Sequence, residues 1–117
     1  MRVLFLLFII LAPAYSSAQT VIFCQMEANL DWRTDAKKIQ TFDLGQFKFS
    51  IQNEKKIKFG SDGFFSNHEM DIESYSSPEY FQATSYNTLL VYNNGIFNYS
   101  HVYQDSIGLV AATCDKF

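Results

Sequence analysis

Proline, glycine and cysteine are scarce in this chain of 117 residues, which has 2 prolines, 5 glycines and 2 cysteines. The glycines lie apart from one another, so there is no glycine-rich loop of the kind that cradles a phosphate group. Basic residues are also few, with 9 Lys and Arg against 12 Asp and Glu. The net charge of -3 lacks the basic excess that nucleic-acid binding uses, so we expect no nucleic-acid partner.

Hydrophobic and aromatic residues, in contrast, are abundant. They make up 48% and 17% of the chain, and 12 residues are Phe and 7 are Tyr. This composition is too apolar for a disordered chain, and the length suits one core rather than two. We therefore expect a single globular domain.

The one long apolar run, Val3–Leu11, precedes a small-residue cleavage pattern at Ser16–Ala18, with Ala12–Ala14 as a second choice. This arrangement is typical of a secretory signal peptide, and the run is much shorter than the roughly 20 residues of a membrane span. We expect residues 1–18 to be a cleaved leader and residues 19–117 to form one exported all-β domain. The predicted location is secreted or periplasmic, with no transmembrane span in the mature chain.

Export makes the two cysteines informative. Cys24 and Cys114 lie near the two ends of the mature chain, and cysteines in an oxidising compartment usually pair. A free thiol pair and a redox couple are the alternatives, but the chain has no Cys-x-x-Cys motif. We therefore predict one structural disulfide that joins head to tail.

Alternating apolar and polar residues predict strands through most of the mature chain. The clearest are Gln46–Gln52 and Lys56–Phe59, where a three-residue loop would pair Ile51 with Ile57 and keep all apolar side chains on one face. Further strands are expected at Val21–Glu27, His68–Tyr75, Tyr80–Ser85, Thr88–Asn93, Ile96–Ser100 and Ile107–Cys114.

Asn94 and Gly95 give the strongest hairpin signal, because a type I′ turn needs positive φ at both central residues. A two-residue loop would pair Tyr92 with Phe97, and a three-residue loop would pair Val91 with Phe97.

Two segments are expected to lack strand structure. Ala28–Phe42 shows no alternation and is predicted to be a loop with one or two helical turns, while Ser76–Pro78 is predicted to be a second loop.

Together these patterns predict an all-β fold, a small antiparallel barrel or sandwich of seven or eight strands closed by one disulfide. The predicted core consists of Ile22, Met26, Phe47, Phe49, Ile51, Ile57, Phe59, Ile72, Phe81, Leu90, Phe97, Tyr99, Leu109 and Ala111.

No motif predicts catalysis or a cofactor. The chain has two histidines, His68 and His101, and no Gly-x-Ser-x-Gly elbow. Glu69, Asp71 and Glu73 would share one strand face, where three carboxylates are able to hold Ca²⁺, although a solvated outer face is the preferred interpretation. We expect no catalytic residue, no metal site and no cofactor.

Two groups of residues are candidates for binding. Lys48, Lys56 and Lys58 fall on the outer face of one hairpin and would suit an anionic cell-envelope polymer or an acidic partner protein. The alternative is ion pairing with the carboxylates of the next strand. The second group combines aromatic and loop residues, which are frequent in binding sites: Trp32, Tyr75, Ser76, Ser77, Glu79 and Tyr80.

The layout of leader, short all-β domain and terminal cysteines resembles small periplasmic inhibitors of c-type lysozyme. In that family a β-barrel presents a loop with Ser and Tyr that plugs the enzyme cleft. Ser76-Ser77-Pro78-Glu79-Tyr80 is similar to this loop, but the glycine that the family has between Ser and Tyr is absent.

The preferred hypothesis is a monomeric, non-enzymatic binding module for an unknown protein or cell-envelope polymer. An inhibitor of an extracellular or periplasmic hydrolase is the alternative. A small hydrolase would require His68 or His101 close to a carboxylate or hydroxyl group in a pocket, and a subunit of a surface assembly would self-associate.

Overall fold

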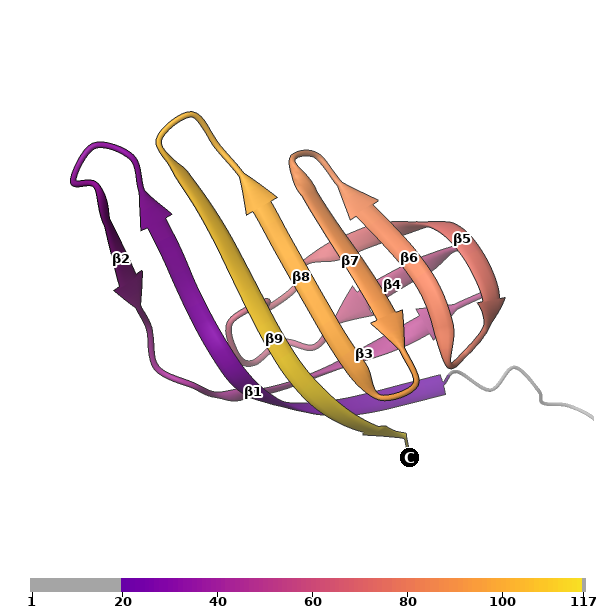
Figure 1. The fold of residues 1–117 in the computed structure, drawn as a ribbon. Helices are drawn as coiled ribbons and strands as arrows, with labels where there is room; N and C mark the ends of the chain where they lie inside the picture. The colour runs from indigo at the N-terminus through magenta and orange to yellow at the C-terminus, as the bar shows by residue number, and fades with distance from the viewer. Residues whose placement is uncertain (1–19, 117) are drawn as a thin grey trace, which may run out of the picture.

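The structure is a computed structural model that describes residues 20–116, and these form a meander of antiparallel strands (Figure 1). The leader predicted at residues 1–18 lies outside the described residues. The strands are β1 (Thr20–Arg33), β2 (Lys38–Thr41), β3 (Gln46–Gln52), β4 (Lys56–Phe59), β5 (Glu69–Ser77), β6 (Tyr80–Ser85), β7 (Thr88–Asn93), β8 (Ile96–Val102) and β9 (Ser106–Lys116).

Eight of these strands close into a barrel, which decides between the two predicted architectures. Strand β1 pairs with β3 on one edge and with β9 on the other, so the ring runs β1-β3-β4-β5-β6-β7-β8-β9 and returns to β1. The short strand β2 is additional and pairs with β1. Closure removes the exposed edges that an open sheet would have at β1 and β9.

The predicted disulfide lies on the seam of this barrel. Cys24 of β1 and Cys114 of β9 are directly opposite in the strand register, with Cα atoms 4.0 Å apart, and they are bonded. The bond therefore fastens the first strand to the last, across a sequence separation of 90 residues. Between residues 20 and 116, the structure has no helix that is long and apolar enough to cross a membrane.

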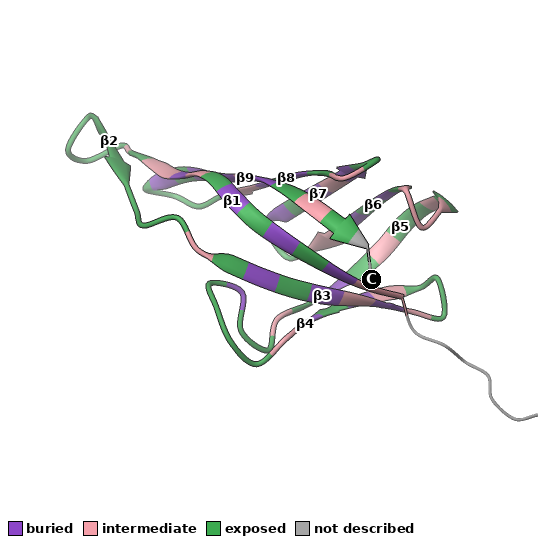
Figure 2. Ribbon diagram, turned by 90° about the horizontal axis from the view of Figure 1, so that it is seen from below, coloured by how far each residue is buried: buried purple, intermediate pink, exposed green. Residues whose placement is uncertain are grey.

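The barrel interior is filled as alternation predicts. Buried and exposed residues alternate along β1 and β3, which is visible as alternating purple and green bands in Figure 2. Every residue of the predicted core is buried except Ile72 and Ala111, which are half-buried, and Leu109, which is exposed. Inward side chains are small on β9 because phenylalanine rings from other strands occupy the interior.

Phe65 belongs to the core although it lies outside every predicted strand and is absent from the predicted core. The connection between β4 and β5 folds back so that this ring lies 4.5 Å from Phe59, 5.0 Å from Phe47 and 4.7 Å from Tyr99, measured between ring centroids. Phe65 is only 4% exposed and therefore acts as a plug for the barrel end.

Both predicted hairpins are confirmed. Ile51 pairs with Ile57 across the three-residue loop between β3 and β4. Tyr92 pairs with Phe97, which selects the two-residue loop, and Asn94 and Gly95 have the positive φ angles of 47° and 87° that this turn requires.

The prediction of a loop with helical turns at Ala28–Phe42 is wrong. Strand β1 continues to Arg33, a turn follows, and β2 returns along β1. The pairing with β9 shifts between Met26 and Ala28, so the extra residue Glu27 forms a β-bulge. Inward positions are even-numbered before the bulge and odd-numbered after it, which hides the alternation in the sequence.

The set of inward-facing residues predicted for the last strand is also wrong. Leu109 points outward and is 42% exposed, whereas Val110 and Ala112 point into the core. In the nearly continuous apolar run at Ile107–Cys114 a single polar residue, Thr113, marks the outer face, and the predicted core did not take it into account.

Candidate binding site around Lys48

A hollowed surface lies on the outer face of the barrel next to the disulfide seam. Phe23 of β1 stands opposite Lys48 of β3 on one side and Asp115 of β9 on the other. In the next row Gln25 stands opposite Gln46 and Thr113. These side chains point outward because their strand neighbours Cys24 and Phe47 point into the core.

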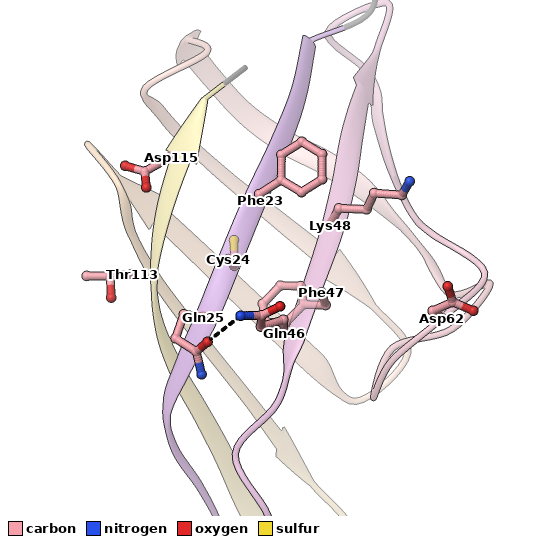
Figure 3. Close-up of a pocket in the computed structure, with 9 residues that line it drawn as sticks. All are labelled: Phe23, Cys24, Gln25, Gln46, Phe47, Lys48, Asp62, Thr113 and Asp115. Carbon is pink, nitrogen blue, oxygen red and sulfur yellow. Dashed lines mark hydrogen bonds between the residues drawn. The ribbon is translucent and has the colours of Figure 1, made fainter.

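A hollow of about 420 Å³ lies among these side chains (Figure 3). The amide of Gln46 donates a hydrogen bond of 2.9 Å to the side-chain oxygen of Gln25, drawn as a dashed line in Figure 3. The lining of the hollow combines two aromatic rings, side-chain amides and charges of both signs. It consists of Phe23, Cys24, Gln25, Gln46, Phe47, Lys48, Asp62, Thr113 and Asp115.

Lys48 has a defined position along the barrel wall. Its ammonium group lies 5.9 Å from the centroid of the Phe23 ring, within the range of a cation–π interaction. Its aliphatic carbons lie so close to Gly60 that a Cβ atom there would come within 3.1 Å of them. The lysine therefore extends between the aromatic ring and the glycine.

A second hollow of about 480 Å³ lies on the other side of Lys48, over β1, β3 and β4. Lys48 and Lys58 both line it, and among residues 20–116 no carboxylate lies within ion-pair distance of either ammonium group. The remaining lining consists of Val21, Phe49, Ser50, Gln52, Phe59, Gly60, Ser61 and Asn67. Two cations and several neutral polar groups therefore face one recess.

Lys56, the third lysine of the predicted patch, differs from the other two. Its ammonium group lies 3.5 Å from a carboxylate oxygen of Glu69 and 3.5 Å from one of Asp71. The charge of Asp71, followed by the hydrogen bond to Glu69, raises the pKa of Lys56 above its ordinary value. The alternative of pairing with the next strand is thus confirmed for Lys56.

The third carboxylate of that strand is also engaged within the sheet. Glu73 accepts a hydrogen bond of 3.0 Å from the hydroxyl group of Thr84. Within the described part of the chain, no group of three or more His, Cys, Asp and Glu side chains is arranged to hold a metal ion.

The second predicted group of binding residues is not brought together. Trp32 lies near the C-terminal end of β1, whereas the others belong to the hairpin of β5 and β6. The predicted loop Ser76–Pro78 is wrong, because Ser76 and Ser77 are in β5 and only Pro78 and Glu79 form the turn before Tyr80.

This turn is short and bonded to its surroundings. The backbone N–H of Glu79 donates a hydrogen bond of 3.1 Å to the hydroxyl of Ser77, and its carbonyl accepts one of 2.7 Å from Asn94 of the neighbouring hairpin. Tyr75 is half-buried and stacks on Phe81, with ring centroids 6.3 Å apart. The residues Ser76–Tyr80 therefore form a strand end and a tight, hydrogen-bonded turn rather than a long loop.

One polar pair brings His101 close to a carboxylate, which is one of the features that the small-hydrolase alternative requires, although the sequence did not identify Asp31 as the partner. The Nε2 atom of His101 lies 3.6 Å from a carboxylate oxygen of Asp31, and both side chains are mostly buried. Gly108 lies between them in the strand register, and a Cβ atom there would collide with the side chains of Asp31 and His101. Asp31 belongs to the segment after the bulge, so no sequence signal placed it opposite a histidine.

Comparisons of the chain with models of protein families, with curated proteins and with solved structures find no match. The recesses around Lys48 are therefore interpreted from their own chemistry.

Proposed function

We propose that the protein is an exported, non-enzymatic binding module that holds an anionic polymer of the cell envelope at the two hollows around Lys48. The observation that carries this proposal is the pair of lysines, Lys48 and Lys58, that face one recess without a carboxylate partner among the described residues. The leader predicted from the sequence and the disulfide support secretion or a periplasmic location.

The two lysines of the second hollow favour a polysaccharide with carboxylate or phosphate groups, whereas the first hollow, which Asp62 and Asp115 also line, suits its neutral hydroxyl groups. Anionic groups would interact with Lys48 and Lys58, and hydroxyl groups would hydrogen-bond to Gln25 and Gln46. A sugar ring has an apolar face that suits contact with the exposed ring of Phe23.

The inhibitor alternative receives less support from the geometry. Such an inhibitor would present a projecting segment to an enzyme cleft, whereas the segment similar to the lysozyme-inhibitor loop ends in a two-residue turn at Pro78 and Glu79.

Isothermal titration calorimetry with oligogalacturonate tests the proposal, with the carboxyl-reduced oligosaccharide as the uncharged control. Each exposed ionic contact contributes roughly 0.2–1 kcal/mol, so Lys48→Gln and Lys58→Gln are each expected to weaken binding by about 1.4- to 5-fold. Lys55→Gln removes the same charge from the hairpin tip, outside both hollows, and is expected to leave affinity unchanged.

The salt dependence provides a second criterion. Binding is expected to weaken between 50 mM and 500 mM NaCl, because salt screens exposed charges. Equal affinity for the charged and the reduced oligosaccharide, or equal losses in all three lysine variants, would contradict the proposed site.

A further inference from the structure

Strand β2 leaves one sheet edge open in an otherwise closed barrel. It is the terminal strand of the sheet order and pairs with β1 alone among the described strands. All four of its residues are exposed, and in Figure 1 it lies at one side of the sheet with no further strand beside it.

One hydrogen bond shows which backbone groups of β2 face this open edge. The N–H of Phe42 donates a hydrogen bond of 2.8 Å to the carbonyl of Asn29 on β1. Backbone groups alternate between the two edges along a strand, so Lys38 and Gln40 also face β1. The N–H and C=O groups of Ile39 and Thr41 therefore face outward and are available to another strand.

An apolar row runs across the sheet to this edge. Ile39 of β2 stands opposite Trp32, Trp32 opposite Ile107, and Ile107 opposite Val102. These side chains are 59%, 40%, 51% and 56% exposed, in the order Ile39, Trp32, Ile107 and Val102. Proteins protect solvent-facing sheet edges from pairing by keeping the edge strand short and by placing lysines on it. Strand β2 is short and contains Lys38. The apolar row nevertheless offers a second strand a surface to contact.

We propose that the partner of this edge is a second copy of the chain, whose β2 pairs antiparallel with the first about a two-fold axis at Gln40. In this register Ile39 of one copy stands opposite Thr41 of the other, so all four outward groups of each strand find partners. The apolar row of each copy then meets Thr41 of the other copy, beyond which Leu30 and Leu109 follow in the strand register.

Charge complementarity selects this register over its neighbours. Lys37 precedes β2 and Asp43 follows it, and neither takes part in an ion pair among the described residues. Pairing Ile39 with Thr41 of the second copy places Lys37 of each chain opposite Asp43 of the other, twice per dimer. Registers centred on Ile39 or on Thr41 do not place Lys37 opposite Asp43.

This inference departs from the monomer expected from the sequence, and it is independent of the proposed ligand. A dimer would carry two copies of the hollows around Lys48, so binding of a long polymer would gain from multivalency.

Sedimentation equilibrium of the mature chain between 1 μM and 1 mM tests the proposal. We expect the mass to rise from one chain to two with concentration. Thr41→Pro removes an N–H that faces the open edge and none that faces β1, so this variant is expected to remain a monomer with an almost unchanged unfolding midpoint. Thr41→Val keeps the N–H and is expected to dimerise like the parent chain.

A charge exchange provides a test that does not introduce proline. Lys37→Glu and Asp43→Lys are each expected to raise the dimer dissociation constant about 10-fold, because each creates two unfavourable pairs. The double variant K37E/D43K is expected to restore dimerisation. A chain that stays monomeric at 1 mM, or a double variant no better than the single ones, would overturn the proposal.

Discussion

The disulfide between Cys24 and Cys114 is expected to contribute a large part of the stability of the barrel. The bond closes a loop of 90 residues, for which the chain-entropy model gives a loss of about 15 cal/mol/K in the unfolded chain. At 25 °C this corresponds to about 4.6 kcal/mol, a large share of the stability of a domain of this size. The double variant C24A/C114A is therefore expected to unfold about 20 °C lower than the parent chain.

Urea unfolding, followed by far-UV circular dichroism and by the fluorescence of the single tryptophan, measures this loss. The expected result is a decrease of about 4 kcal/mol in the free energy of unfolding with the same β signal in the folded state. Dithiothreitol should lower the stability of the parent chain to that of the variant and leave the variant unchanged. A loss below about 1 kcal/mol would refute the reasoning, because the bond would then restrict little of the unfolded ensemble.

Three further predictions concern the barrel interior. Gly108→Ala is expected to cost about 2 kcal/mol in chemical unfolding, because its Cβ would collide with Asp31 and His101, and an unchanged stability would contradict the close approach. Phe65→Ala is expected to cost about 3 kcal/mol, because it removes the plug of the barrel end, whereas the exposed Phe64 should tolerate alanine within about 0.5 kcal/mol. Burial raises the pKa of Tyr99 to about 12, so stability should fall as pH rises from 10 to 12, where the folded chain retains a proton that the unfolded chain loses. Tyr99→Phe should flatten this decline in pH-dependent unfolding.

The sequence predicts the fold best where local rules act alone. The register between β3 and β4 follows from the positions of Ile51 and Ile57, and the turn at Asn94 and Gly95 follows from their tolerance of positive φ. Both features depend only on residues that are close in the chain.

The sequence-based predictions fail where contacts between distant parts of the chain determine the structure. The bulge at Glu27 reverses the inward phase of β1, and its position depends on pairing with β9, far away in sequence. Phe65 becomes a core residue because the barrel end needs a plug, which no local pattern shows.

The candidate site was predicted only in part, for the same reason. Lys48 and Lys58 are placed on one outer face by alternation along a single hairpin. Phe23 and Asp115 join them only because the barrel closes between β1 and β9. The pairing of Lys56 with Glu69 and Asp71 was an open alternative in the sequence and required the register of β5.

A nuclear magnetic resonance titration of the ¹⁵N-labelled mature chain with oligogalacturonate would locate the binding surface residue by residue. We expect chemical-shift changes to concentrate at Phe23, Lys48, Lys58 and their strand neighbours. Changes centred on Ser76–Tyr80, or spread evenly over the exposed lysines, would contradict the proposed site.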